Sequence, residues 1–126
     1  MKMAVSIRNA VRRGAVALVV ALSSLVSTSF AAPVISYTAS NSSGNNWVYQ
    51  YTVSNPAPSD LIAEFTIWFD QSQYSNLSVI SSPATWDSIV IQRDLSIPAD
   101  GFFDALALGT ELGVGATLTG FSVGFT

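Results

Sequence analysis

The sequence predicts an all-β protein: an immunoglobulin-like antiparallel β-sandwich of about seven strands, preceded by a signal peptide. Residues 61–70 alternate between two registers, which is the period of a half-buried strand. Strand-like runs recur about every 8–12 residues and are separated by turn-forming residues. No segment beyond the leader carries the apolar periodicity of a helix. These patterns favour a sandwich over a helical or α/β domain.

The start of the chain has the three parts of a signal peptide. A basic start precedes an apolar run at 15–26, and the small residues Ser29 and Ala31 provide a signal-peptidase site. The apolar run is shorter than the roughly 20 residues that a membrane-spanning helix requires, which argues against an anchor. We therefore expect cleavage after Ala31, with residues 1–31 as the leader and residues 32–126 as one β-sandwich domain.

Turn-forming residues divide the predicted domain into short strands. A Ser/Asn/Gly segment at 40–46 and a proline-containing segment at 55–60 supply two of these turns. The strands on either side of 55–60 are predicted to be antiparallel neighbours. The segment 102–108 fits either a strand or a single helical turn. The other strands are expected at 34–39, 47–54, 61–70, 77–80, 86–92 and 116–126.

The segment 61–70, LIAEFTIWFD, is predicted to be the central strand. One register is wholly apolar, and the other carries both charges. We expect the apolar register to face the core, with Phe65 as its anchor. Ile62 and Trp68 are apolar exceptions in the charged register, so the face that they occupy is the place to look for a covering loop or a ligand.

Removal of the leader would change the net side-chain charge from −3 to −7, because four of the five basic residues lie in it. The predicted domain keeps Arg93 and all eight acids. One arginine without any lysine cannot make the phosphate contacts on which nucleic-acid binding relies. Attraction to an anionic membrane surface is disfavoured for the same reason. We therefore expect no nucleic-acid partner and no membrane association after cleavage.

The chain contains no cysteine and no histidine. Disulfides therefore cannot form, and Ser–His and Cys–His catalytic pairs are excluded. The predicted domain also lacks a lysine that could act as a base, and its acids lie in separate turns rather than in one motif. We expect that the protein is not an enzyme.

Trp68 is the candidate centre of a ligand-binding face. An outward tryptophan on a sheet is a platform on which a sugar ring can stack, and Tyr49 or Tyr74 would extend it. The alternative is that a loop or a neighbouring strand covers Trp68 as part of the core. Single exposed aromatic side chains are ordinary on protein surfaces.

A candidate metal site is formed by Asp94, Asp100 and Asp104, which lie close together in the sequence around a Pro/Gly turn. Carboxylate oxygens on a flexible loop are the ligands that Ca²⁺ prefers, and a bound cation would offset the negative charge of the domain. The spacing does not match an EF-hand loop. The alternative is that these aspartates cap turns. No other cofactor is implied.

Several short motifs follow one another along residues 34–126, namely WVYQYTVSN (47–55), EFTIWFD (64–70), YSNLSV (74–79), PATWD (83–87), DGFFDA (100–105) and GATLTGFSVGF (115–125). Their order resembles that of the small secreted β-sandwich domains of bacterial exported proteins that usually carry a PEP-CTERM (exosortase) sorting tail. The resemblance implies a periplasmic, envelope or extracellular location in a Gram-negative bacterium. The tail of that family would follow Thr126, which leaves two alternatives open: release without the anchor, or a chain that continues further.

The expected function is a structural or interaction role in the cell envelope or outside the cell. The expected partners are extracellular polysaccharide or envelope proteins. The alternative is a carbohydrate-binding or Ca²⁺-binding extracellular module.

Overall fold

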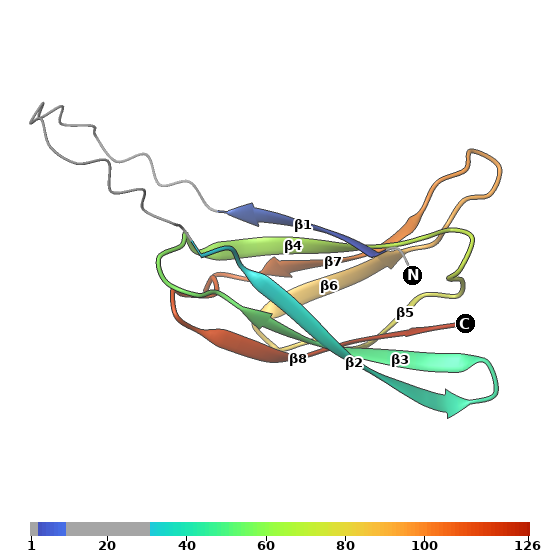
Figure 1. Ribbon diagram of the computed structural model, residues 1–126, viewed down its shortest axis with the longest axis horizontal. Coiled ribbons are helices and arrows are strands. Elements are labelled where there is room, and N and C mark those ends of the chain that lie inside the picture. Colours follow the sequence, from blue (N-terminus) through green and yellow to red (C-terminus); the bar gives the residue numbers. More distant parts are fainter. Residues whose placement is uncertain (1–2, 10–30) are drawn as a thin grey trace, which may run out of the picture.

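The protein consists of two antiparallel four-stranded sheets that pack face to face (Figure 1). The computed structural model describes residues 3–9 and 31–126. Sheet A has the strand order β1-β4-β7-β6, and sheet B has the order β2-β3-β8-β5. The strands are β1 (Met3–Asn9), β2 (Val34–Ser43), β3 (Asn46–Ser54), β4 (Ile62–Phe69), β5 (Ser78–Ser81), β6 (Trp86–Ile91), β7 (Gly101–Ala107) and β8 (Thr117–Phe125). The predicted all-β sandwich is confirmed.

Strands β2 to β8 correspond to the predicted strands of residues 32–126, with small shifts at their ends. The ambiguous segment 102–108 is strand β7, which pairs with β4 on one side and with β6 on the other. Strand β2 extends to Ser43, so the predicted turn at 40–46 narrows to its centre, where Gly44 has a φ of +54°. Polar side chains are compatible with this exposed hairpin because they can stay in contact with solvent on both faces.

The prediction that 47–54 and 61–70 pair with each other is wrong, since β3 belongs to sheet B and β4 to sheet A. The connection between them crosses from one sheet to the other, and Asn55 holds it in place. Asn55 is fully buried, and its side-chain amide donates to the carbonyl oxygens of Asp60 (2.8 Å) and Leu112 (3.0 Å). These bonds tie the crossing to the segment that joins β7 and β8.

The strand order differs from that of an immunoglobulin domain. If β2 to β8 are counted as the seven strands of such a domain, the last strand would pair with the sixth. Here β8 lies between β3 and β5, and β7 lies between β4 and β6. The protein therefore has the two packed sheets of a sandwich, but its strand order differs from that of an immunoglobulin domain.

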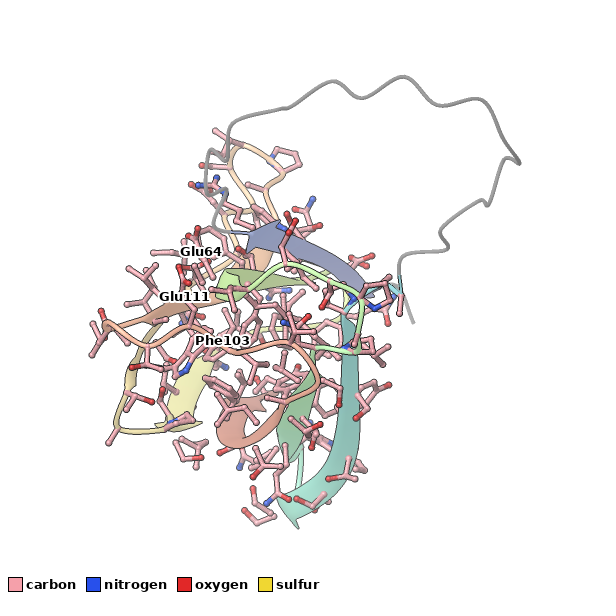
Figure 2. All side chains as sticks on the ribbon, turned by 90° about the vertical axis from the view of Figure 1, so that its left-hand side faces the viewer. Glu64, Phe103 and Glu111 are labelled. Carbon is pink, nitrogen blue, oxygen red and sulfur yellow. The ribbon has the colours of Figure 1, made fainter. Side chains whose placement is uncertain are left out.

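The core lies between the two sheets, and β4 contributes its predicted apolar register to it. Phe65 and Ile67 are fully buried, and Phe69 is almost fully buried. Beside them in sheet A, Phe103 of β7 pairs with Ile67 and is fully buried. Its side chain points into the space between the sheets (Figure 2). The inward direction of the Phe65 register is therefore confirmed.

Ile62, one of the two apolar exceptions in β4, is covered by the chain itself. Its backbone N–H donates to the Leu112 carbonyl at 3.1 Å, and the Leu112 N–H donates back to the Ile62 carbonyl at 2.9 Å. Both side chains are buried. The exception at Ile62 is thus explained by packing against the segment that precedes β8, which leaves Trp68 as the exception to be explained.

Strand β1 lies within the segment predicted to be the leader. Residues 3–9 pair antiparallel with β4 at the outer edge of sheet A (Figure 1). The apolar run predicted at 15–26 and Ser29 of the predicted cleavage site lie outside the described residues. The signal peptide and its cleavage after Ala31 stay predictions. No helix in the described part of the chain is long and apolar enough to cross a membrane.

Candidate functional site

Trp68 stands on the outer face of sheet A, with 37% of its surface exposed. The register of the sheet places it beside Phe102 of β7, which in turn lies beside Ile91 of β6. The Trp68 and Phe102 rings are 4.9 Å apart between centroids and are tilted by 51°. A row of three apolar side chains therefore crosses the sheet on its solvent side.

Further apolar side chains lie in the two rows beside this one. Ile89 of β6 and Leu106 of β7 are each close to half exposed on the same face. The loop between β6 and β7 projects beyond the sheet (Figure 1), and it carries Leu95 and Ile97, with 62% and 70% exposure. We call the outward residues of the three strands the Trp68 face, consisting of Glu64, Thr66, Trp68, Asp87, Ile89, Ile91, Phe102, Asp104 and Leu106.

Carboxylates are set among the apolar side chains of the Trp68 face. Asp104 lies in its middle row and accepts a hydrogen bond of 2.6 Å from the Thr66 hydroxyl. Glu64, labelled in Figure 2, lies one row further along β4. Its carboxylate is 3.7 Å from the Arg8 guanidinium of β1. Asp87 is exposed at the β6 end of that row. The face therefore combines apolar contact area with negative charge.

Tyr49 and Tyr74, the predicted extensions of the aromatic platform, do not lie on this face. Both are 95% buried, and their hydroxyl oxygens are 3.2 Å apart, within hydrogen-bonding distance. Burial, together with the bond to Tyr49, raises the pKa of the Tyr74 hydroxyl well above its usual range. The structure gives these two tyrosines a place in the core, with their rings against Phe125.

The three aspartates of the predicted calcium site are not brought together. Asp94 accepts hydrogen bonds from the Ser96 hydroxyl (2.6 Å) and N–H (2.8 Å), and these bonds hold the pKa of its carboxyl below the usual range. Asp100 accepts a bond from the Gln71 N–H at 2.9 Å, and Asp104 belongs to the Trp68 face. Among residues 3–9 and 31–126, no three acids lie close enough to hold a metal ion.

Sheet B carries a different surface, which the sequence analysis did not single out. A hollow of about 510 Å³ lies along β2, β3 and β8, and none of the described residues that line it is charged. Its polar lining consists of Ser36, Thr38, Gln50, Thr52, Ser81, Thr119 and Ser122. We call this the sheet B hollow. The signal for it in the sequence is the run of polar residues at every second position of β2, from Ser36 to Ser42.

A second, smaller hollow of about 230 Å³ lies further along the same strands. It is lined by residues that include Asn46, Asn76 and the partly exposed Trp47. The two faces of the sandwich therefore differ in chemistry: the Trp68 face is apolar and acidic, while sheet B offers uncharged hydroxyls and amides.

Comparisons of the chain with protein-family models, with curated proteins and with solved structures find no match.

Proposed function

We propose that this protein is a secreted or cell-envelope interaction domain, without catalytic activity, that binds a protein partner through the Trp68 face. The observation that carries the proposal is the outward row formed by Trp68, Phe102 and Ile91, in which Trp68 and Ile91 are exposed and Phe102 is partly buried. The scaffold is immunoglobulin-like in its two layers, with its own strand order.

The apolar content of the Trp68 face supports an interaction role. Scattered exposed apolar side chains are normal, whereas contiguous ones are typical of surfaces that bind another molecule. The inward registers of β4 and β7 already fill the core, so the outward Phe102, Leu106 and Ile89 are not required for it. A partly exposed tryptophan at such a place is a typical centre of binding energy in protein interfaces.

The charges of the face indicate the chemistry of the partner. Asp104, Glu64 and Asp87 lie in the two rows on one side of the apolar row, and the predicted domain carries a net charge of −7. A partner that contributes an apolar ridge flanked by lysine or arginine would satisfy both features. This expectation agrees with the resemblance to exported domains, which implies an envelope or extracellular partner.

Photo-crosslinking in a host that exports the protein tests the proposal. A photoreactive amino acid at Ile89 probes the Trp68 face, and the same amino acid at Gln50 probes the outer face of sheet B as a matched control. We expect a discrete protein adduct from position 89, its loss when Trp68→Ala is added, and no such adduct from position 50. Equal adducts from both positions, or none from position 89, would contradict the proposal.

A second candidate is the binding of a neutral polysaccharide in the sheet B hollow. Its volume and its lining of hydroxyls and amides without charge support this alternative. Pull-down with insoluble polysaccharides distinguishes three cases. Loss of binding in the double variant Gln50→Ala/Thr52→Ala would assign the ligand to the hollow. Loss in Trp68→Ala would assign it to the Trp68 face, and no binding by the wild-type protein would rule this candidate out.

A further inference from the structure

Strand β4 has a neighbour on its outer side that comes from the predicted leader. The pairing between β1 and β4 runs from Met3 opposite Phe69 to Ile7 opposite Phe65, followed by Arg8 opposite Glu64. The Ile7 side chain is partly buried and packs against the core. The structure thus shows what an added strand at this edge looks like, including its direction and its register.

Without β1, strand β4 becomes the edge of sheet A, because β7 is its only other neighbour among the described strands. The backbone N–H and C=O groups that face β1 would then have no partner in the sheet. The zero exposure of Phe65 and Ile67 holds with β1 in place, so removal of Ile7 would also open a gap beside the core. An open edge next to apolar surface is a template for another strand.

We propose that, after leader removal, the β4 edge accepts an extended segment of a partner protein as an antiparallel strand in the place of β1. The proposal rests on the proposed interaction role and adds the manner of binding to it. Backbone hydrogen bonds would supply affinity, and the side-chain positions that face the core would supply specificity.

The β1 contacts define the chemistry of the incoming segment. At the position opposite Phe65 the segment needs an apolar residue, because Ile7 fills the edge of the core there. At the next position it needs a basic residue, because Arg8 faces the Glu64 carboxylate there at 3.7 Å. The acidic charge of the domain favours the same kind of segment.

A second copy of the exported domain does not fit this description. Strands β2 to β8 contain no lysine or arginine, so none of them can place a basic residue opposite Glu64. The one basic residue of the predicted domain is Arg93, which follows β6 and donates to the Gln71 carbonyl oxygen at 2.5 Å. The proposal therefore commits to a segment from another protein.

The experiment starts from the complete gene, expressed with its own leader in a Gram-negative host. Mass spectrometry of the exported product determines where it begins. The synthetic peptide MKMAVSIRN, which is residues 1–9 of this chain, then serves as the probe strand. Its binding is measured by titration, and hydrogen exchange follows the amides of Ile62–Phe69 with and without it.

We expect the exported product to lack residues 1–31 and to bind the peptide. At a peptide concentration ten times its Kd, exchange of the β4 amides that face away from β7 should slow about tenfold. An Ile7→Asp peptide should bind at least about tenfold more weakly, because it would place a charge against the core. An Arg8→Glu peptide should bind with about two- to fivefold lower affinity, as expected for the loss of an ion pair at a partly exposed site.

Three results would overturn the proposal: an exported product that retains residues 3–9, a peptide that leaves β4 exchange unchanged, or a product that dimerises through β4. The proposed function is judged separately, by the adduct formed from position 89. If that adduct forms while the peptide fails to bind, only the edge proposal is wrong. If the peptide binds but no adduct forms from position 89, the proposal that a partner binds the Trp68 face is wrong, and the proposal for the β4 edge stands.

Discussion

Tyr51 is a core residue whose buried hydroxyl group makes no hydrogen bond to the described residues. Its side chain is 1% exposed, and its hydroxyl has no hydrogen-bond partner among the described residues. A buried polar group without a partner costs about 1–3 kcal/mol, so Tyr51→Phe should raise the free energy of unfolding by about 1 kcal/mol. Urea denaturation measures the change. Tyr74→Phe is the control, because it removes the contact with the Tyr49 hydroxyl and should lower stability by about 1 kcal/mol.

The same tyrosines predict how stability depends on pH. Burial raises the pKa of the Tyr51 and Tyr74 hydroxyls well above the usual value of about 10. Above pH 10 the unfolded chain loses these protons while the folded protein retains them, so rising pH favours unfolding. The urea midpoint should be steady from pH 7 to 9 and fall above about pH 10, with a shallower fall in Tyr51→Phe. A midpoint unchanged up to pH 11 would contradict this.

Phe65 is the residue that anchors the core from β4. Its ring lies 5.0 Å from Phe121, 5.8 Å from Trp86 and 6.0 Å from Phe103 between centroids. Phe65→Ala should cost about 3–5 kcal/mol, because the cavity is enclosed by aromatic rings from both sheets. Trp68→Ala, in the opposite register, should cost only about 1 kcal/mol. Denaturation midpoints of the two variants measure the difference, and a loss below about 1 kcal/mol for Phe65→Ala would mean that the registers are inverted.

At the scale of elements, the crossing from β3 to β4 depends on Asn55. Besides the two bonds donated by its side chain, its side-chain oxygen accepts a bond from the Ser59 hydroxyl at 2.5 Å. Asn55→Ala would leave the Asp60 and Leu112 carbonyls without this donor. It should lower the free energy of unfolding by about 2–3 kcal/mol. Ser59→Ala, which removes one partly buried bond, should cost about 1 kcal/mol. Equal effects of the two variants in thermal unfolding would argue against Asn55 as the link.

The strands of residues 34–125 could be predicted because periodicity and turn residues are local properties of the sequence. Which strands pair could not be predicted in the same way. Alternation shows which side chains share a face, but it does not show that β3 and β4 lie in different sheets. The crossing is set by Asn55, whose buried bonds reach a carbonyl far along the chain at Leu112. No short-range sequence pattern predicts such a long-range contact.

The candidate sites show the same division. The outward direction of Trp68 follows from its register, whereas its partner Phe102 comes from a strand over thirty residues away. Tyr49 shares the register of Tyr51 in β3, and both side chains are buried. The prediction that Tyr49 extends the Trp68 platform did not take this shared register into account. Nearness in sequence did not bring Asp94, Asp100 and Asp104 together, because each caps or contacts a different backbone or side-chain group.

At the scale of the whole molecule, the spread of the acids predicts that calcium has little effect on stability. A structural Ca²⁺ site requires six to eight oxygen ligands around one ion, and the described residues do not gather three acids at any point. We expect the melting temperature to be the same in EDTA and in millimolar Ca²⁺, as measured by calorimetry. A rise of several degrees with Ca²⁺ would show that a cation site exists after all.

The molecule as a whole presents two sheets with different outer surfaces and one strand, β4, on which the interaction proposals converge. Its inner register builds the core, its outer register carries Trp68, and its edge is occupied by β1. The leader would therefore cover part of the binding region until it is removed.

The most direct test of the interaction role is the affinity of the protein partner identified by crosslinking, measured by calorimetry with three purified exported proteins. These are the wild type, Trp68→Ala and Gln50→Ala, the last being a change on the outer face of sheet B. Since a central interface tryptophan commonly contributes about 2 kcal/mol or more, Trp68→Ala should weaken binding by at least tenfold. Gln50→Ala should change it by less than about twofold. A large loss in Gln50→Ala with Trp68→Ala unaffected would place the interface on the opposite sheet and contradict the proposed role of the Trp68 face.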